Sequence, residues 1–251
     1  MQTQTPKLIL VPTDFSAPAA HALRYAAALG ARFEAHLLVI YAGLFVPPVD
    51  FTSGAAGIFD IPRDDLIEAA REQLQTFAET NMSTDLPYDV RVMFGTPVEA
   101  ILDLVRESGA NLVVMGTHGR TGLRRLLFGS VTEAVMRVAP VPVIAVHEAT
   151  PETAPMQVIA GSRSSAEGRA AIEYAGLLAD VDTARFVETS ETDLLDAARR
   201  ERVDLIALGV SGEHRDRQGV VQHSNCAVLT VNALAADALH ARQVAPACAR
   251  S

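Results

Sequence analysis

Two glycine-containing segments carry the residue types with which this chain could hold a phosphate. The first segment reads GTHG and begins at Gly116, and the second reads GSVT and begins at Gly129. Glycines let backbone N–H groups approach an anion, and a helix starting at Ser130 would direct its positive dipole end to the same place. Three arginines between the segments offer countercharge, although the last two fit a solvated face equally well: Arg120, Arg124 and Arg125.

A carboxylate follows the first apolar run of the chain, at Asp14 in the stretch VPTDFS. Carboxyl ends of parallel strands meet at one edge of a sheet, so we expect Asp14 to lie near the glycine segments. Asp14 is either a ligand or a plain Asx cap at a helix entry. His118 is more typical of a solvated loop residue than of a general base, because no carboxylate is placed to orient it. We therefore predict no catalytic residue.

Lysine chemistry is almost absent, because Lys7 is the only lysine among 21 basic residues. A lysine-containing phosphate loop, an internal Schiff-base lysine and a kinase-type Lys–Glu pair are excluded unless Lys7 serves them. Lys7 opens a predicted strand and is more typical of a solvated edge residue. Any phosphate site must therefore rely on backbone N–H groups and arginine.

Composition limits the remaining classes of protein. A net charge of −9 disfavours general binding to nucleic acid or to a membrane surface. The N-terminal run LILVPTD is too short for a signal or a membrane span. Two cysteines, Cys226 and Cys248, form no disulfide framework and lack metal-ligand spacing with the histidines. These features favour a cytoplasmic protein without a metal site.

The chain repeats itself. Residues 8–29 align with 157–178 at an offset of 149, which places Tyr25 on Tyr174. Residues 96–119 align with 189–212 at an offset of 93, which places Gly116 on Gly209. The second half is thus the same unit with a block removed from its middle, and the stretch 147–156 is the predicted linker.

Apolar runs alternate with helix-period segments in the first half, which predicts a parallel α/β sheet covered by helices on both faces. Ser16 is a predicted helix N-cap, and Thr96 with Glu99 predicts a capping box. The run 42–62 has no period and is a predicted long loop. Predicted strands cover 7–13, 35–41, 88–94, 111–116 and 141–147, and predicted helices cover 16–30, 63–80, 97–109 and 129–139.

The glycine segments have the spacing G-x2-G-x9-G-S, which resembles the ATP-binding motif of the universal stress protein family. The Pro-Thr-Asp turn after the first strand resembles that family too, and the second half resembles it in outline. The resemblance implies a tandem protein with a five-stranded sheet in the order 3-2-1-4-5. It also implies ATP as the bound nucleotide, with Mg²⁺ left open.

Family roles carried over to this sequence define an adenosine side and a phosphate side. Asp14 would bind adenosine, Pro12 and Thr13 would shape the wall beside it, and Ile40 would meet adenine through its backbone. The residues at and beside the glycine segments would form the phosphate side: Met115, Gly116, His118, Gly119, Arg120, Gly129, Ser130, Val131 and Thr132.

The second half has lost these features. Its counterpart of Asp14 is Arg163, its glycine segments stand three residues closer together, and the capping serine is absent. The deleted block is expected to remove the counterpart of the second strand, which supplies the adenine wall. A copy retained for its surface and simple drift after duplication both predict that this half binds no nucleotide.

We therefore predict three parts: a nucleotide-binding domain at 1–147, a degenerate domain at 156–232 and a tail at 233–251, helical or disordered. The last strands of the two halves, 141–146 and 227–231, are expected to pair and form an intramolecular pseudo-dimer. A homodimer of the whole chain stays open. The leading hypothesis is an ATP-dependent stress-response binding module. The alternatives are a slow ATPase, a protein that phosphorylates itself on Ser130 or Thr132, and a structural pseudo-dimer that binds no nucleotide.

Overall fold

The computed structural model describes residues 5–43, 63–82, 85–117, 129–161, 164–179, 184–186, 191–210 and 217–244. Each strand and helix predicted for the first half is present, with bounds shifted by at most three residues. Most of the predicted loop at 42–62 and the end of the tail lie outside the described residues.

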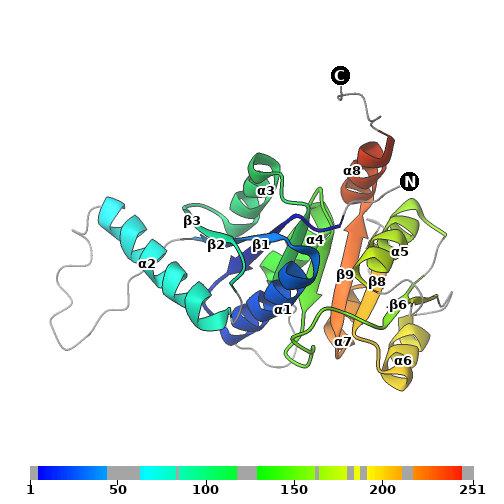
Figure 1. Cartoon of the computed structure of the whole chain (residues 1–251). Helices are drawn as coiled ribbons and strands as arrows, with labels where there is room; N and C mark the ends of the chain where they lie inside the picture. The colour runs from blue at the N-terminus through cyan, green and yellow to red at the C-terminus, as the bar shows by residue number, and fades with distance from the viewer. Residues whose placement is uncertain are drawn as a thin grey trace.

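One nine-stranded sheet runs through the chain in the order β3-β2-β1-β4-β5-β9-β8-β6-β7 (Figure 1). Every neighbouring pair is parallel except β5 and β9, which are antiparallel. The α/β class and the order of the first five strands are confirmed. The strands are β1 (Leu8–Thr13), β2 (His36–Ala42), β3 (Tyr88–Met93), β4 (Leu112–Gly116), β5 (Val143–Val146), β6 (Val158–Ala160), β7 (Ala184–Phe186), β8 (Leu205–Val210) and β9 (Ala227–Asn232).

Two expectations about the sheet are wrong. It does not end after five strands, because β5 pairs with β9 and both halves share one sheet. This strand pair is the one expected from the sequence, since apolar edge strands need covering. The second half also retains a strand at the place of β2: the three-residue β7 pairs with β6 as β2 pairs with β1. One short strand therefore stands in place of β2, α2 and β3.

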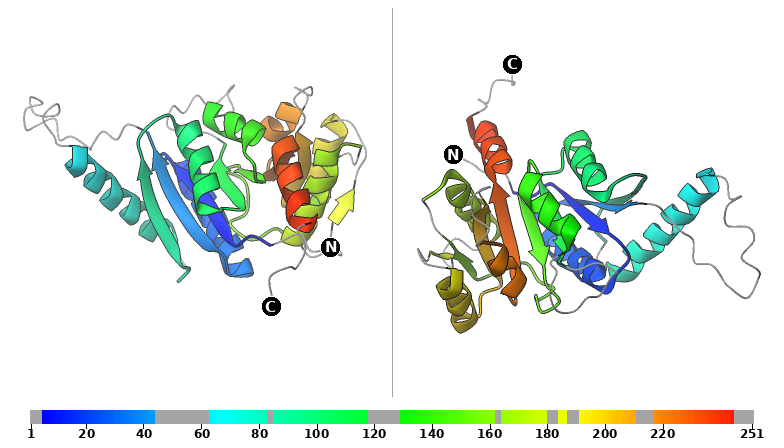
Figure 2. Two further views of the ribbon diagram at one scale, coloured as in Figure 1. Left: turned by 90° about the horizontal axis from the view of Figure 1, so that it is seen from above. Right: turned by 180° about the vertical axis from the view of Figure 1, so that it is seen from behind.

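Helices cover both faces of the sheet (Figure 2). The hydrophobic core on one face includes side chains of α1, α2, α5 and α8, and the core on the other includes α3, α4, α6 and α7. Each core continues across both halves. The helices are α1 (Ala17–Phe33), α2 (Arg63–Asn81), α3 (Pro97–Ser108), α4 (Ser130–Val138), α5 (Ala166–Leu178), α6 (Glu191–Glu201), α7 (Arg217–His223) and α8 (Ala233–Val244).

Helix starts test the predicted caps. The Ser16 hydroxyl accepts a hydrogen bond from the Ala19 N–H at 3.3 Å, so this predicted N-cap is confirmed. Thr96 precedes α3 as predicted, but its side chain caps no backbone N–H. The Thr96 hydroxyl instead donates to the Glu99 carboxylate. The two side chains of the predicted capping box thus bond to each other rather than to the helix backbone.

Equivalent residues make equivalent contacts in the two halves. The Asn111 side-chain oxygen accepts from the N–H groups of Lys7 and Leu8, at the start of β1. Its counterpart Asp204 accepts from the N–H groups of Met156 and Gln157, just before β6. A carboxamide and a carboxylate thus hold the beginning of the first strand in each half.

Two tyrosines related by the repeat reach across to the opposite half. The Tyr174 hydroxyl donates to the Asn111 carbonyl oxygen at 3.2 Å. Tyr25 is also fully buried, and its hydroxyl has no hydrogen-bond partner in the described residues. Burial raises the pKa of Tyr25, with further contributions from Cys226 and Asp204 of the second half.

This asymmetry predicts different effects for two identical substitutions. Tyr174→Phe removes a buried hydrogen bond and is expected to lower the free energy of unfolding by about 1 kcal/mol. Tyr25→Phe removes a buried hydroxyl that makes no bond, so we expect an unchanged or slightly higher free energy of unfolding. Urea unfolding followed by circular dichroism measures both, and equal losses would contradict the prediction.

Among the described helices, none is long and apolar enough to cross a membrane.

Candidate functional site

The carboxyl ends of β1 and β4 lie side by side at the centre of the first-half sheet. The chain leaves β1 into α1, which packs on one face, whereas β4 leads towards α4, which packs on the other. Parallel α/β proteins bind ligands at the sheet edge beside such a reversal, and this edge of the first half is called the crevice below. The turn at Asp14 and the segment around Gly116 therefore meet there, as the sequence predicted.

Side chains of the β1–α1 turn hold its backbone in place. The Thr13 hydroxyl accepts from the Phe15 N–H at 2.9 Å, and Asp14 Oδ1 accepts from the Ser16 N–H at 3.0 Å. Ser16, not Asp14, caps α1. Asp14 thus closes an Asx turn ahead of the helix with one oxygen and is partly exposed at the crevice.

Phe15 is a residue of this turn that sequence reasoning missed. Its φ is 64°, in the left-handed region that bulky residues rarely adopt. Its ring stacks on Tyr41 at 4.9 Å and meets the edge of Phe77 at 5.6 Å. These ring contacts anchor the strained turn. No pattern in the sequence signals a positive φ at a phenylalanine.

The described ends of the glycine motif are joined by hydrogen bonds. The Gly129 N–H donates to the Thr117 carbonyl at 2.7 Å. The Thr132 hydroxyl donates to the Gly116 carbonyl at 2.8 Å. The start of α4 is therefore held against the end of β4, although residues 118–128 separate the two ends in sequence.

Each of these two glycines has a steric reason. A Cβ at Gly116 would lie 2.9 Å from the Pro18 carbonyl carbon and oxygen, so this glycine lets β4 pack against the first turn of α1. A Cβ at Gly129 would lie 3.0 Å from the Thr117 carbonyl oxygen. Gly129 is also the N-cap of α4 and has no side chain to cap the helix, so the first N–H groups of α4 can donate hydrogen bonds to an anion.

The remaining predicted residues lie at different depths. Pro12 pairs with Ile40 inside the sheet, and Ile40 and Met115 are buried. Tyr41 and Ala42 follow Ile40 in β2, so Ile40 lies near the end of the strand, as expected. Ser130 is exposed, Val131 packs partly on the core, and Thr132 is buried. His118, Gly119 and Arg120 lie outside the described residues.

A polar connection from the crevice to the linker was also missed. Buried Thr117 and His147 approach each other, with 3.5 Å between the hydroxyl and Nδ1. Further along the linker, Glu152 accepts from Arg24 of α1 at 2.6 Å and contacts His21 Nδ1 at 2.9 Å. The Arg24 hydrogen bond lowers the pKa of Glu152, with the His21 contact adding to it. The linker therefore lies against the helix that starts at the crevice.

The comparisons with known proteins agree with this geometry. A profile of the universal stress protein family matches residues 6–147. The chain belongs to the universal stress protein family. Universal stress protein MJ0531 of Methanocaldococcus jannaschii is 31% identical over 142 residues, which cover 57% of this chain and 82% of that protein.

Two solved universal stress proteins extend the comparison. One from Archaeoglobus fulgidus covers 90% of this chain and 98% of its own at 16% identity, with a TM-score of 0.65. That match shows a similar fold over both halves. Another, solved in complex with cAMP, is 26% identical over 57% of this chain and 98% of its own, with a TM-score of 0.39.

Proposed function

We propose that this universal stress protein binds ATP in the crevice of its first half and acts as a nucleotide-dependent binding module. The observation that carries the proposal is the junction of β4 and α4. There the two described ends of a G-x2-G-x9-G-S motif meet at an uncapped helix N-terminus. Backbone N–H groups at such a helix start attract phosphate oxygens without lysine.

The residues at hand suit an adenine nucleotide with its phosphates over α4. Ser130 is exposed at the helix start, where its N–H and hydroxyl would donate to phosphate oxygens. Asp14 stands at the neighbouring turn, where its carboxylate would accept from the nucleoside. Met115, His118, Gly119 and Arg120 are proposed to complete the phosphate side, and Pro12 and Ile40 are proposed to belong to the adenosine side.

We infer that residues 156–232 form a degenerate copy that holds no nucleotide. The matching roles of Asn111 and Asp204, and of Ser16 and Ser165 as helix caps, support a duplicated origin. The copy lacks the α4-type Gly-Ser start, and Arg163 stands in place of Asp14. We propose that this copy covers the edge strand β5, so that the two halves form an intramolecular pseudo-dimer. We also propose that the protein is cytoplasmic.

Self-phosphorylation is the second candidate function. Its two possible acceptors, Ser130 and Thr132, differ in exposure. The buried Thr132 hydroxyl is bound to the Gly116 carbonyl, which leaves exposed Ser130 as the accessible hydroxyl of the pair. Incubation with γ-labelled ATP, with Mg²⁺ or with EDTA, distinguishes the candidates. Retained intact nucleotide supports the binding module. Label that is attached to the protein and is lost in Ser130→Ala supports self-phosphorylation on Ser130. Steady phosphate release supports an ATPase. No nucleotide in either condition would contradict the proposal.

Asp14→Asn separates the ligand role of Asp14 from its role in the turn. Asparagine keeps an Oδ1 acceptor for the Ser16 N–H, so the melting temperature without ATP should barely change. Loss of a charged acceptor from the nucleotide is expected to cost about 1.5–3 kcal/mol, or roughly 10–100-fold in affinity. Calorimetric titration measures this loss. Unchanged affinity with a lowered melting temperature would assign Asp14 to the turn alone.

A further inference from the structure

Phe15 has a strained backbone conformation between β1 and α1, with φ 64°. The two other described non-glycine residues with a positive φ, Glu34 and Arg202, directly follow helices. A left-handed residue commonly ends a helix, so their conformation has a local reason. Phe15 precedes a helix instead, and a left-handed φ is unfavourable for so large a side chain.

Two neighbouring elements hold the Phe15 ring. The ring stacks on Tyr41, near the carboxyl end of β2, with 4.9 Å between the centroids and 22° between the planes. It meets the edge of Phe77 of α2 at 5.6 Å and 83°. Aromatic contacts of these two geometries are favourable beyond the area that they bury. They can therefore offset the cost of the left-handed backbone.

The φ of Phe15 decides where the Asp14 carboxylate lies. The Phe15 N–H donates to the Thr13 hydroxyl, and the Ser16 N–H donates to Asp14 Oδ1. Rotation about this φ would turn the peptide between Asp14 and Phe15 relative to Ser16, so the bond from Ser16 to Asp14 would break. The carboxylate therefore keeps its place at the crevice only while Phe15 stays left-handed.

The second half shows that the helix start does not require an aromatic residue. Residues 163–164, an arginine and a serine, stand in place of Asp14 and Phe15. Ser165 nevertheless caps α5 by accepting from a backbone N–H of the helix at 3.0 Å, as Ser16 caps α1. The second half has thus lost the aromatic residue together with the carboxylate, and it has kept the cap.

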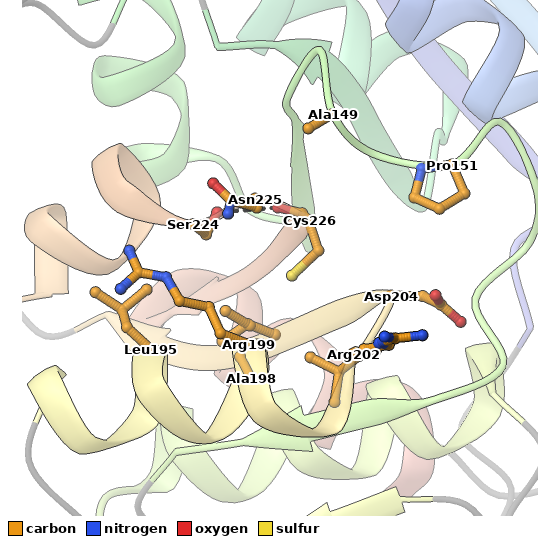
Figure 3. Close-up of a pocket in the computed structure, with 12 residues that line it drawn as sticks. Ala149, Pro151, Leu195, Ala198, Arg199, Arg202, Asp204, Ser224, Asn225 and Cys226 are labelled. Atoms are coloured by element: carbon orange, nitrogen blue, oxygen red, sulfur yellow. Dashed lines mark hydrogen bonds between the residues drawn. The ribbon is translucent and has the colours of Figure 1, made fainter.

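A cavity in the second half does not replace the crevice. It has a volume of about 440 Å³ and is bounded by α6, the amino ends of β8 and β9, and the linker (Figure 3). The counterpart of the Asp14 turn follows the carboxyl end of β6. Because β6, β8 and β9 are parallel, the cavity lies at the opposite edge of the sheet. The strained aromatic residue therefore occurs only in the half that has the proposed nucleotide site.

We propose that Phe15 is a positioning residue for the nucleotide. Its ring, held by Tyr41 and Phe77, keeps the turn left-handed and thereby directs the Asp14 carboxylate to the crevice. This inference rests on the proposed function of the crevice. Phe15 acts through Asp14 rather than by contact with the ligand. Glycine, which adopts a left-handed φ without strain, should therefore serve at this position as well as phenylalanine does.

Phe15→Gly and Phe15→Ala separate the conformation of the turn from the presence of the ring. Both substitutions remove the ring, but only alanine keeps the cost of a positive φ. The alanine turn should relax in the absence of ATP, and its re-formation on binding is expected to weaken the affinity roughly tenfold. Phe15→Gly should bind ATP within about twofold of the unchanged chain. Calorimetric titration of the full chain with ATP measures both affinities.

Phe33→Ala is the matched control. Phe33 is the last residue of α1 and packs, partly buried, against the same hydrophobic core as Phe15. Its loss should lower the melting temperature, as both Phe15 substitutions should, but leave the ATP affinity unchanged. If Phe15→Ala does not fold, Phe77→Leu keeps the sequence of the turn, removes one ring contact and should weaken binding roughly threefold. Equal losses in Phe15→Gly and Phe15→Ala would overturn the proposal.

The Asp14→Asn background supplies a result that a loss of packing alone would not give. In this background Phe15→Ala should weaken ATP binding by at most about twofold more, because the carboxylate that Phe15 positions is absent. A further tenfold loss would show that Phe15 does not act through Asp14. Unchanged affinity in Phe15→Ala would refute the role of Phe15 alone. No ATP binding by the unchanged chain would refute the proposed function of the crevice, and the role of Phe15 with it.

Discussion

Gly129→Val is expected to abolish ATP binding, which means a loss of more than about 100-fold in affinity. A Cβ at this position would lie 3.0 Å from the Thr117 carbonyl oxygen and 3.5 Å from the Thr132 hydroxyl. The two further methyl groups of valine would crowd the junction that holds the start of α4 against β4. They would also occupy the space through which phosphate oxygens reach the α4 N–H groups.

The chain should still fold with this substitution, at a lowered melting temperature, because the Thr117 carbonyl must move by a few tenths of an ångström to admit the Cβ. Gly129 has φ −55° and ψ 122°, a conformation open to other residues, so valine introduces no left-handed strain. The first N–H groups of α4 already have no side-chain cap, so replacing Gly129 removes no capping hydrogen bond from the helix. Calorimetry of ATP binding together with the apo melting temperature separates the two effects.

Gly219→Val is the matched control in the second half. Gly219 lies in α7, at the place of the last glycine in the degenerate copy of the motif. Because that copy is proposed to hold no nucleotide, ATP affinity should not change. Similar losses of affinity from Gly129→Val and Gly219→Val would show that the asymmetric assignment is wrong.

Local patterns predicted the elements of the first half and the pairing of β5 with β9. Apolar periodicity and the Ser16 cap depend on neighbouring residues, so they can be recognised in one sequence. The repeat supplied the long-range information, because equivalent last strands leave equivalent apolar edges. The short strand β7 was missed because it pairs with β6 over only three residues. So short a segment has no recognisable periodicity, and the sequence does not show which strand it pairs with.

The site was predicted less completely than the fold. Sequence spacing brought Asp14, Gly116 and Gly129 to one edge, but it could not distinguish a residue on the crevice from one inside the sheet, such as Ile40. The strained turn at Phe15 and the contact of Thr117 with His147 depend on tertiary packing. The predicted capping box at Thr96 also depends on side-chain geometry, which the sequence does not show. The Thr96 hydroxyl can bond either to a backbone N–H of α3 or to the Glu99 carboxylate, and in the structure it bonds to Glu99.

Gly116 illustrates how a motif residue can have a structural cause. Its repeat counterpart Gly209 ends up in the same kind of contact, because a Cβ there would lie 2.2 Å from the Gly168 nitrogen and 2.5 Å from the Glu167 carbonyl carbon. Both glycines let a central strand approach the first turn of a helix. The second half is proposed to bind no nucleotide, yet it retains this glycine, so we propose that close packing is the reason for the glycine at both positions and that any phosphate role of Gly116 is additional.

Gly209→Ala is therefore expected to destabilise the chain strongly. Backbone atoms of α5 cannot move aside as a flexible side chain would, so the helix must shift away from β8, at a cost of about 3 kcal/mol or more. For a chain of this size, that corresponds to a fall in melting temperature of roughly 6–12 °C. Unfolding should remain a single transition, because both hydrophobic cores continue across the two halves.

Two comparisons make this prediction decisive. Gly116→Ala should cost less than Gly209→Ala, since its closest contacts are 2.9 Å rather than 2.2 Å. Gly176→Ala lies on the same helix α5 but meets no atom within 4 Å, so alanine should stabilise that helix by about 0.5–1 kcal/mol. Differential scanning calorimetry of the three variants gives all the values. If Gly209→Ala and Gly176→Ala shifted the melting temperature in the same direction, close packing of β8 on α5 could not be the reason for Gly209. Its counterpart Gly116 would then need the phosphate role for its explanation.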